Sequence, residues 1–245
     1  MRIKKVLPTS QDTVVISVGG SILIPDQNDS VYIGKLANML KEASKTVRIC
    51  VVVGGGKIAR YYTVTGRELG GNEDQLDMLG IGCTRLNAGL LALALGDVSS
   101  TEIPLDVKTA AKMFQKGGIV VMGGTEPGHT TDAVATMLAR ELKAKLVINA
   151  TSVDAVYSDD PRKNPNAERY DAITIDRLEE LVYSDHGAGK SSVFDPLGVK
   201  IAKEEGIDIA MVDGRNLPEL EKAVLGKPFS GTYITSPKAR NPRTA

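Results

Sequence analysis

The chain contains short, almost continuously apolar runs rich in valine and isoleucine, and the first three of them lead directly into glycine clusters. A run that is apolar at every position, rather than at every second one, is typical of a strand covered on both faces, and therefore of a parallel sheet. The runs predicted to be strands are Thr13–Val18, Val47–Val53, Ile119–Met122, Lys145–Asn149 and Ile207–Val212.

Longer segments with apolar residues at helical spacing lie between these runs. The clearest are Tyr32–Ala43, Asp132–Lys143 and Pro196–Glu205. Strands that alternate with helices predict an α/β fold, a three-layer α/β/α sandwich with a mainly parallel central sheet and right-handed crossovers. The polar, proline-punctuated stretch Ser158–Tyr170 is predicted to be a long surface loop or a boundary between two halves, and Ser184–Phe194 a second flexible segment.

Each of the first three predicted strands is followed by a glycine cluster. The clusters are Gly19-Gly20-Ser21, Gly54-Gly55-Gly56-Lys57 and Gly123-Gly124-Thr125. In an open parallel sheet, ligands bind outside the carboxyl ends of the strands. Glycine there lets backbone N–H groups approach a phosphate, and a following helix N-terminus favours negative charge. A single cluster would be read as a tight turn, but three at successive strand ends predict an anion site.

Two cations and one loop extend this site. Lys57 and Arg60 are one helical turn apart after the triple glycine, where a lysine can neutralise a transferring phosphoryl group and an arginine can clamp phosphate oxygens. The loop Thr125–Asp132 joins a strand to a helix that Thr130 or Thr131 can cap. His129 in this loop is a weaker candidate, because phosphoryl transfer to an anionic phosphate depends mainly on positioning and charge neutralisation.

Two partial motifs are rejected. Gly54-x-Gly56-x-x-Ala59 fits a dinucleotide fingerprint, but the acidic residues that should follow at a strand end, Asp74 and Asp77, lie in a helical pattern. The segment from Ser184 to Ser191 approaches a P-loop, but it lacks the first glycine and follows a predicted helix.

Composition narrows the class of protein. The 245 residues are 42% hydrophobic and carry 30 basic and 30 acidic side chains, which argues against a dedicated nucleic-acid or membrane-surface binder. Cys50 sits in an apolar run, which favours a buried thiol, and two histidines with two distant cysteines do not predict a zinc site. The polar N-terminus, and the absence of a run of about 18 apolar residues, predict a cytoplasmic protein.

The sequence resembles the amino-acid-kinase superfamily, and within it the archaeal-type uridylate kinases. The combination of GGGKxAR with GGTxPGHTTD is specific to that group, and the matching segments occur in family order over nearly the whole chain. They are Val14–Pro25, Val51–Tyr62, Asp77–Leu91, Val121–Ala135, Thr151–Pro161 and Ser191–Ala202.

The resemblance implies phosphoryl transfer from ATP, with Mg²⁺ on its phosphates, to UMP in a homohexameric enzyme of pyrimidine biosynthesis. It implies one domain, 1–245, with an acceptor lobe at about 1–150 and an ATP lobe at about 151–245. The implied ATP-binding residues are Gly20, Ser21, Gly56, Arg60, Thr151, Ser152, Tyr157 and Asp160. The implied UMP-binding residues are Gly55, Asp77, Thr125, Glu126, Pro127, Gly128, His129, Thr130 and Thr131, with no residue assigned to a metal.

The chain departs from the family in two places. Many members carry a lysine where this chain has Ser17, so Lys57, with Arg60, is the expected catalytic cation. The asparagine that follows the adenosine-site threonine in the family is Ser152 here, and Lys190 is a further cation of undefined role.

Other functions remain open from the sequence alone. Carbamate and isopentenyl-phosphate kinases share the fold, but the latter use a histidine at the position of Val53. A non-catalytic nucleotide- or oxyanion-binding relative would be expected to lose the glycines or cations, which are intact. The hypothesis that the protein is a dehydrogenase depends on one partial glycine pattern.

Overall fold

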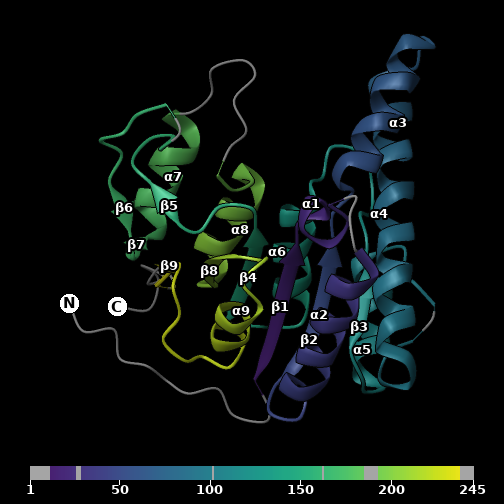
Figure 1. Cartoon of the computed structure of the whole chain (residues 1–245), viewed down its shortest axis with the longest axis horizontal. Coiled ribbons are helices and arrows are strands. Elements are labelled where there is room, and N and C mark those ends of the chain that lie inside the picture. The colour runs from purple at the N-terminus through teal and green to yellow at the C-terminus, as the bar shows by residue number, and fades with distance from the viewer. Residues whose placement is uncertain (1–11, 26–28, 101, 162, 185–192, 238–245) are drawn as a thin grey trace, which may run out of the picture.

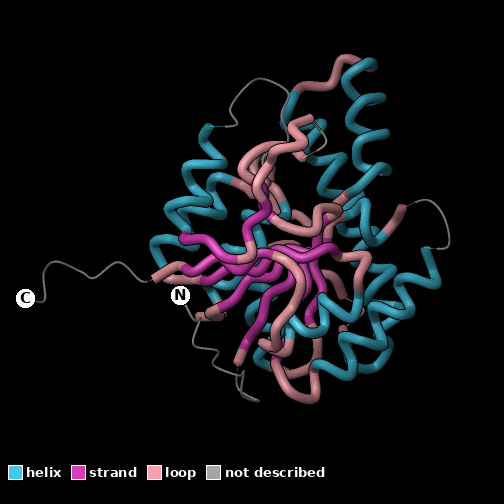
Figure 2. The backbone as a smooth tube through the Cα atoms, turned by 60° about the vertical axis from the view of Figure 1, so that its left-hand side comes forward, coloured by secondary structure: helices cyan, strands magenta, loops and turns pink. Residues whose placement is uncertain are grey.

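The computed structural model describes residues 12–25, 29–100, 102–161, 163–184 and 193–237. Seven strands form one sheet in the order β3-β2-β1-β4-β8-β9-β7, and the neighbours are parallel except for β8 with β9. Figure 2 shows this sheet as a twisted layer between helices. The strands are β1 Thr13–Val18, β2 Arg48–Val53, β3 Val120–Met122, β4 Leu146–Thr151, β7 Ala172–Thr174, β8 Asp208–Asp213 and β9 Thr232–Thr235.

Helices cover both faces of the sheet (Figure 1). They are α1 Gly20–Leu23, α2 Asp29–Ala43, α3 Gly56–Glu68, α4 Glu73–Leu95, α5 Val107–Gln115, α6 Thr131–Glu141, α7 Ile175–Ser184, α8 Pro196–Glu205 and α9 Leu217–Val224, with a 3₁₀ turn η1 at Gly96–Val98. The five predicted strands and three predicted helices are all present, and their ends differ from the prediction by no more than a few residues.

Alternate residues of the central strands pack into two separate hydrophobic cores, one on each face of the sheet. In β1, Ile16 packs with α2, α4 and α9 on one face, whereas Val15 packs with α5, α6, α7 and α8 on the other. Both side chains are fully buried. Because every strand position meets a core, the runs contain no polar face, and the predicted three-layer α/β/α sandwich is confirmed.

The polar stretch Ser158–Tyr170 belongs to a hairpin that the sequence did not predict. β5 Val156–Tyr157 and β6 Arg169–Tyr170 pair as an antiparallel hairpin, and the intervening residues connect the two strands. Most of Ser184–Phe194, including Lys190, lies outside the described residues.

Helix α4 corrects one expectation. The segment Glu73–Val98 is long and apolar enough to cross a membrane, so the prediction that no segment reaches this length was wrong. The described helix nevertheless packs against α3, α2 and β3 within the domain. Asn87 and Thr84 on its buried side are polar, which is typical of a core helix rather than of a span.

Candidate active site

Two glycine loops meet at the carboxyl ends of β1 and β2. Gly54 donates its backbone N–H to Val18 O at 2.9 Å. A Cβ on Gly20 would lie 2.1 Å from the nitrogen of Gly56 and 2.5 Å from the oxygen of Gly54, so no larger residue fits between the loops. Gly56 also has a φ of +63°, which glycine adopts without strain. The close approach therefore requires glycine on both sides.

A cavity of about 450 Å³ opens beside these loops. Its lining combines the start of α3, one side of α4 and the loop between β3 and α6. The UMP-site residues expected from the resemblance that line it are Gly55, Asp77, Glu126, Gly128, His129, Thr130 and Thr131. Thr125 and Pro127 belong to the same loop but are not among the lining residues, whereas Gly56, Thr63, Ile81 and Thr84 are.

Three side chains on the inner face of α4 hold the glycine loops in place. Asn87, which is 2% exposed, donates its amide to Gly54 O at 2.9 Å and to Gly55 O at 3.2 Å. Thr84 Oγ1 accepts the N–H of Gly124 at 2.7 Å. Arg85 donates from Nε to Gly124 O at 3.2 Å and from Nη2 to the carbonyl of Thr125 at 3.0 Å. Since these bonds satisfy the carbonyls of both loops, one helix sets the shape of the cavity.

The loop after β3 is also fixed from its far end. Asp77 Oδ2 accepts the N–H of Gly128 at 2.7 Å, which brings the carboxylate expected to bind ribose hydroxyls to the edge of the cavity. His129 Nδ1 lies 3.1 Å from Glu126 Oε1 and is buried, yet it makes no hydrogen bond to the described residues. The imidazole is therefore an ion-pair partner only when it is protonated.

Thr130 is the residue that caps α6. Its Oγ1 accepts the N–H of Ala133 at 3.2 Å, and the same hydroxyl donates to Asp195 Oδ2 at 2.8 Å. Asp195 in turn caps α8 by accepting from the N–H of Gly198. Two helix N-termini are thus joined beside the cavity, where their free N–H groups favour an anion.

Asp132 forms a polar cluster that the sequence reasoning did not assign. Its Oδ1 accepts from Ser17 Oγ at 2.7 Å, and its Oδ2 lies 3.4 Å from the donating amide of Asn149. Ser17 and Asn149 face each other across β1 and β4, so the cluster lies just below the strand ends. Burial, and to a lesser extent the nearby charge of Asp195, raise the pKa of Asp132 above its ordinary value, although both hydrogen bonds oppose the shift. Both hydrogen-bond donors to this carboxyl among the described residues, Ser17 and Asn149, are neutral.

The two cations expected to be catalytic lie on the first turns of α3. Lys57 is exposed and donates from Nζ to Pro25 O at 3.2 Å, and Arg60 is exposed one turn further along. Neither is among the residues that line the cavity. They lie next to the paired glycine loops and outside the cavity.

The residues expected to bind ATP fall into two groups. Gly20 and Ser21 open α1 beside Gly56, and Thr151 ends β4, the strand adjacent to β1. Ser152 follows directly, and its carbonyl accepts from the guanidinium of Arg215, which also donates two hydrogen bonds to Asp213. Tyr157 lies in β5, where its hydroxyl donates to Asp154, and Asp160 follows in the connection to β6. The first group lies at neighbouring strand ends and the second belongs to the hairpin beyond them.

A dedicated metal cage does not occur in the described part of the chain, where no three His, Cys, Asp or Glu side chains cluster.

A sequence profile of the amino acid kinase family matches residues 12–213. The chain belongs to the amino acid kinase family, as the resemblance predicted.

Several similar members of this family are uridylate kinases. The chain is 45% identical to the uridylate kinase of Methanococcoides burtonii over 223 residues, which cover 91% of this chain and 95% of that one. It is 41% identical to the uridylate kinase of Thermococcus kodakarensis, with 90% and 98% covered. The crystal structure of uridylate kinase from Archaeoglobus fulgidus superposes with a TM-score of 0.82 at 40% identity, with 91% of this chain and 99% of that chain covered.

The environment of Asp132 predicts a pH-dependent stability. Because the raised pKa means that the fold favours the protonated acid, the contribution of Asp132 to stability is fully present below the ordinary aspartate pKa and is lost as the pH rises through the raised value. We therefore expect Asp132→Asn to gain free energy of unfolding relative to wild type as the pH increases. Urea unfolding between pH 4 and pH 9 measures this difference.

Asp106 provides the matched control. Hydrogen bonds from the backbone N–H and the hydroxyl of Thr109 lower the pKa of this exposed carboxyl. Asp106→Asn should consequently lose stability relative to wild type above the ordinary aspartate pKa. A difference between Asp132→Asn and wild type that does not change with pH would contradict the assignment.

Proposed function

We propose that this protein is a uridylate kinase that transfers the γ-phosphoryl group of ATP to UMP, giving UDP and ADP. The observation that carries the proposal is the cavity between the Gly54–Gly56 loop, α4 and the loop before α6. This cavity opens beside the close contact of the two glycine loops, whose backbone N–H groups are suited to bind phosphate. The uridylate kinases that the chain resembles, at 41–45% identity over about nine-tenths of its length, support the same acceptor.

Phosphoryl transfer to UMP requires little of the protein beyond positioning the two substrates and neutralising their negative charge. The attacking group is an oxygen of the UMP phosphate, which is already anionic and needs no general base. The obstacle is repulsion between two anions, so backbone N–H groups and cations that surround the transferring group lower the barrier. In this proposal Lys57 and Arg60 supply positive charge from α3, and Mg²⁺ bound to ATP supplies more.

The remaining assignments are proposals of the same kind. Gly20, Ser21, Gly56 and Arg60 contact the ATP phosphates, and Thr151, Ser152, Tyr157 and Asp160 form the adenosine site. Asp77 accepts from the ribose hydroxyls of UMP, while Gly55 and the loop Thr125–Thr131 enclose the uridine and its phosphate. The acceptor lobe then corresponds to about 1–150 and the ATP lobe to about 151–245. We also propose a cytoplasmic homohexamer that acts in pyrimidine biosynthesis and binds neither nucleic acid nor membrane.

A panel of acceptors tests the function directly. ADP release with Mg-ATP is measured for UMP, CMP, dUMP, AMP, carbamate, isopentenyl phosphate and no acceptor. We expect turnover with UMP to exceed that with each of the others. Turnover with a different acceptor would show that the protein is a kinase but would contradict the assignment of UMP as its acceptor. Nucleotide binding without turnover would place the protein among non-catalytic members of the fold.

Asp77 should control affinity for UMP. Loss of a charged hydrogen-bond acceptor costs about 1.5–3 kcal/mol, so Asp77→Ala should raise the KM for UMP by roughly 10- to 100-fold while leaving the KM for ATP almost unchanged. Asp77→Asn keeps an acceptor for the N–H of Gly128 and separates the loss of charge from disorder of the loop. Equal weakening of UMP and ATP binding would indicate a general structural defect.

Lys57 should control the rate of transfer. Removing one charge that acts on the transferring group costs about 100-fold in kcat, so we expect Lys57→Ala to lower kcat by that order with a small change in the KM for UMP. Lys57→Arg should restore part of the rate. Lys35→Ala, which removes an exposed lysine from α2, is the control and should have wild-type kinetics. Near-wild-type kcat in Lys57→Ala would assign charge neutralisation to other groups.

A further inference from the structure

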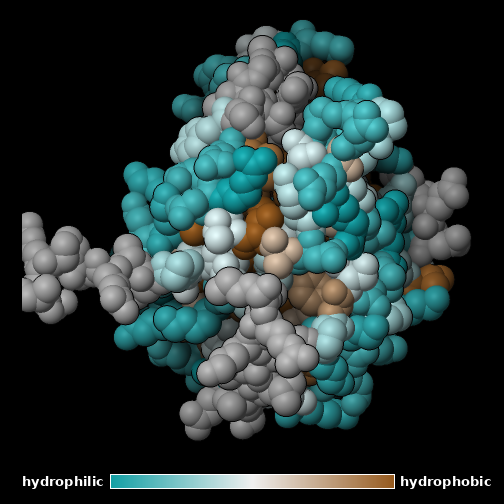
Figure 3. All heavy atoms as spheres, turned by 90° about the vertical axis from the view of Figure 1, so that its left-hand side faces the viewer, coloured by the Kyte–Doolittle hydropathy of each residue, from teal (hydrophilic) through white to brown (hydrophobic). Residues whose placement is uncertain are grey.

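Buried polar side chains are rare in the described part of the chain, and two of them lie close together on α4. Polar groups gather mainly at the surface, as the largely hydrophilic face in Figure 3 shows. Thr84 and Asn87 are buried, one turn apart on the inner side of the helix. A buried polar side chain needs hydrogen-bond partners, and the partners of these two include backbone atoms of the loops after β3 and β2. Their placement therefore indicates a role in shaping those loops.

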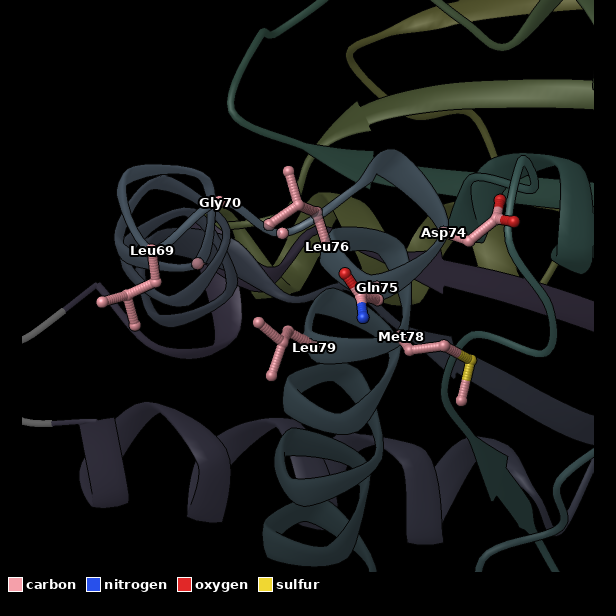
Figure 4. A pocket seen from close by; sticks show the side chains of 9 residues that line it. Leu69, Gly70, Asp74, Gln75, Leu76, Met78 and Leu79 are labelled. Carbon is pink, nitrogen blue, oxygen red and sulfur yellow. The ribbon is translucent and has the colours of Figure 1, made fainter.

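Helix α4 is firmly fixed at the end where it begins. Asn72 and Gln75 form a capping box, in which each side chain accepts the backbone N–H of the other at 2.9 Å. Leu76 and Leu79 lie on the side of α4 that faces α3 (Figure 4), and a Cβ at Gly66 of α3 would lie 2.8 and 2.9 Å from their methyl carbons. Because α3 begins in the glycine loop after β2, the two helices and that loop form one packed unit.

Asn87 holds two successive carbonyls of the loop after β2. Its amide nitrogen donates to Gly54 O at 2.9 Å and to Gly55 O at 3.2 Å. A trans peptide unit is planar, so its N–H points away from its C=O. The carbonyl of Gly54 shares a peptide unit with the N–H of Gly55, and the carbonyl of Gly55 shares one with the N–H of Gly56. Asn87 therefore turns two successive N–H groups away from α4.

Arg85 holds two successive carbonyls of the loop after β3 in the same way. Its Nε donates to Gly124 O at 3.2 Å, and its Nη2 donates to Thr125 O at 3.0 Å. The same peptide geometry turns the N–H groups of Thr125 and Glu126 away from the guanidinium. Nη2 also donates to Leu105 O at 3.3 Å, which ties the guanidinium to the segment before α5.

The four N–H groups oriented by these two side chains make no hydrogen bond to another described residue. They belong to Gly55, Gly56, Thr125 and Glu126, and all of these residues except Thr125 line the cavity. The N–H groups of the preceding glycines in both loops, by contrast, are bonded within the protein. Donors that are fixed before a substrate arrives stabilise negative charge without reorganising, so the two side chains prepare the loops for an anion.

We propose that Asn87 and Arg85 are positioning residues for phosphoryl transfer, each acting through the peptide units that it holds. Asn87 aims the N–H of Gly55 at the phosphate of the acceptor and the N–H of Gly56 at the terminal phosphate of ATP. One amide thus sets the approach of two anions. Arg85 aims the N–H groups of the loop after β3 at the nucleoside part of the acceptor. This assignment rests on the proposed function and gives Asn87 a role in transfer and Arg85 a role in acceptor binding.

Asn87 should govern the rate of transfer. Asn87→Leu nearly keeps the volume of the side chain but removes its donors. We expect kcat to fall on the order of 100-fold, because misdirected N–H groups no longer stabilise the charge of the transferring group, while the KM for UMP changes little. Asn87→Ser keeps one hydroxyl donor and should lie between Asn87→Leu and wild type. It also provides the measurement if Asn87→Leu does not fold.

Arg85 should govern binding of the acceptor. Arg85→Leu removes the hydrogen bonds that hold the loop after β3, so the KM for UMP should rise about tenfold with kcat almost unchanged. Arg85→Lys keeps a cationic donor and should recover part of the affinity. Inhibition by uridine, which has no phosphate, separates the two roles. Arg85→Leu should weaken this inhibition, whereas Asn87→Leu should not.

Nucleotide binding tests the role of Asn87 without any acceptor. Isothermal titration with Mg²⁺ compares ADP with AMP-PNP, a non-hydrolysable ATP analogue that keeps the terminal phosphate. Wild type should bind AMP-PNP more tightly than ADP, and Asn87→Leu should reduce this preference about tenfold, because the N–H of Gly56 no longer faces the terminal phosphate. Arg85→Leu should keep the preference.

Ser236→Ala is the matched control. It removes another buried hydrogen bond, from Ser236 Oγ to Ala202 O at 2.8 Å, and neither residue lines the cavity. This variant should have wild-type kinetics and nucleotide preference. Circular dichroism and thermal unfolding establish that each variant is folded.

Three results would overturn the proposal. These are near-wild-type kcat in folded Asn87→Leu, changes of kcat and KM in the same proportion in Asn87→Leu and Arg85→Leu, and an unchanged preference for AMP-PNP over ADP in Asn87→Leu. The proposed reaction is tested separately. A reduced preference without turnover of UMP by wild type would contradict the reaction but not the role of Asn87. Turnover of UMP with an unaffected Asn87→Leu would contradict that role alone.

Discussion

The site depends on one close contact, in which the backbone of Gly20 lies against that of Gly54 and Gly56. The contact is possible because all three residues are glycines, with no side chain to separate the loops. It brings the end of β1 next to the start of α3, and the N–H groups of both loops lie at one point on the edge of the sheet. The rest of the architecture, a parallel sheet buried on both faces, serves to keep these two strand ends in register.

Helix α4 acts on that contact from outside the sheet. Its inner face carries an amide, a hydroxyl and a guanidinium, all directed at backbone atoms of the loops after β2 and β3. Buried backbone groups that are not in a sheet or helix need such partners, since an unpaired carbonyl or N–H costs free energy. The loops can be irregular and glycine-rich because side chains of the helix supply hydrogen-bond partners for their backbone groups. Its outer face has the opposite composition, with Leu79, Leu86, Leu90 and Leu93 exposed.

The cluster around Asp132 shows how a change of one residue alters the charge balance of a site. A lysine at the position of Ser17 would pair with the carboxylate of Asp132. Here a hydroxyl and an amide take that place, so the acid is held by neutral donors and its pKa is raised mainly by burial. Positive charge for phosphoryl transfer must then come from elsewhere, and Lys57 and Arg60 lie on the adjacent helix.

The sequence by itself determined the five buried parallel strands, three of the helices and the glycine loops, because hydrophobic periodicity and the glycine requirement are properties of near neighbours. It also indicated the family, through short motifs that run from the strand ends into the following helices. Only the tertiary structure decided that Asn87 bonds to Gly54 and that Ser17 bonds to Asp132, 115 residues away. It also decided which leucines of α4 are exposed (Leu79, Leu86, Leu90 and Leu93) and which are buried (Leu76, Leu91 and Leu95). A buried and an exposed leucine look alike in a helical pattern, and a polar side chain does not reveal its partner. Both depend on which distant segments the fold packs together.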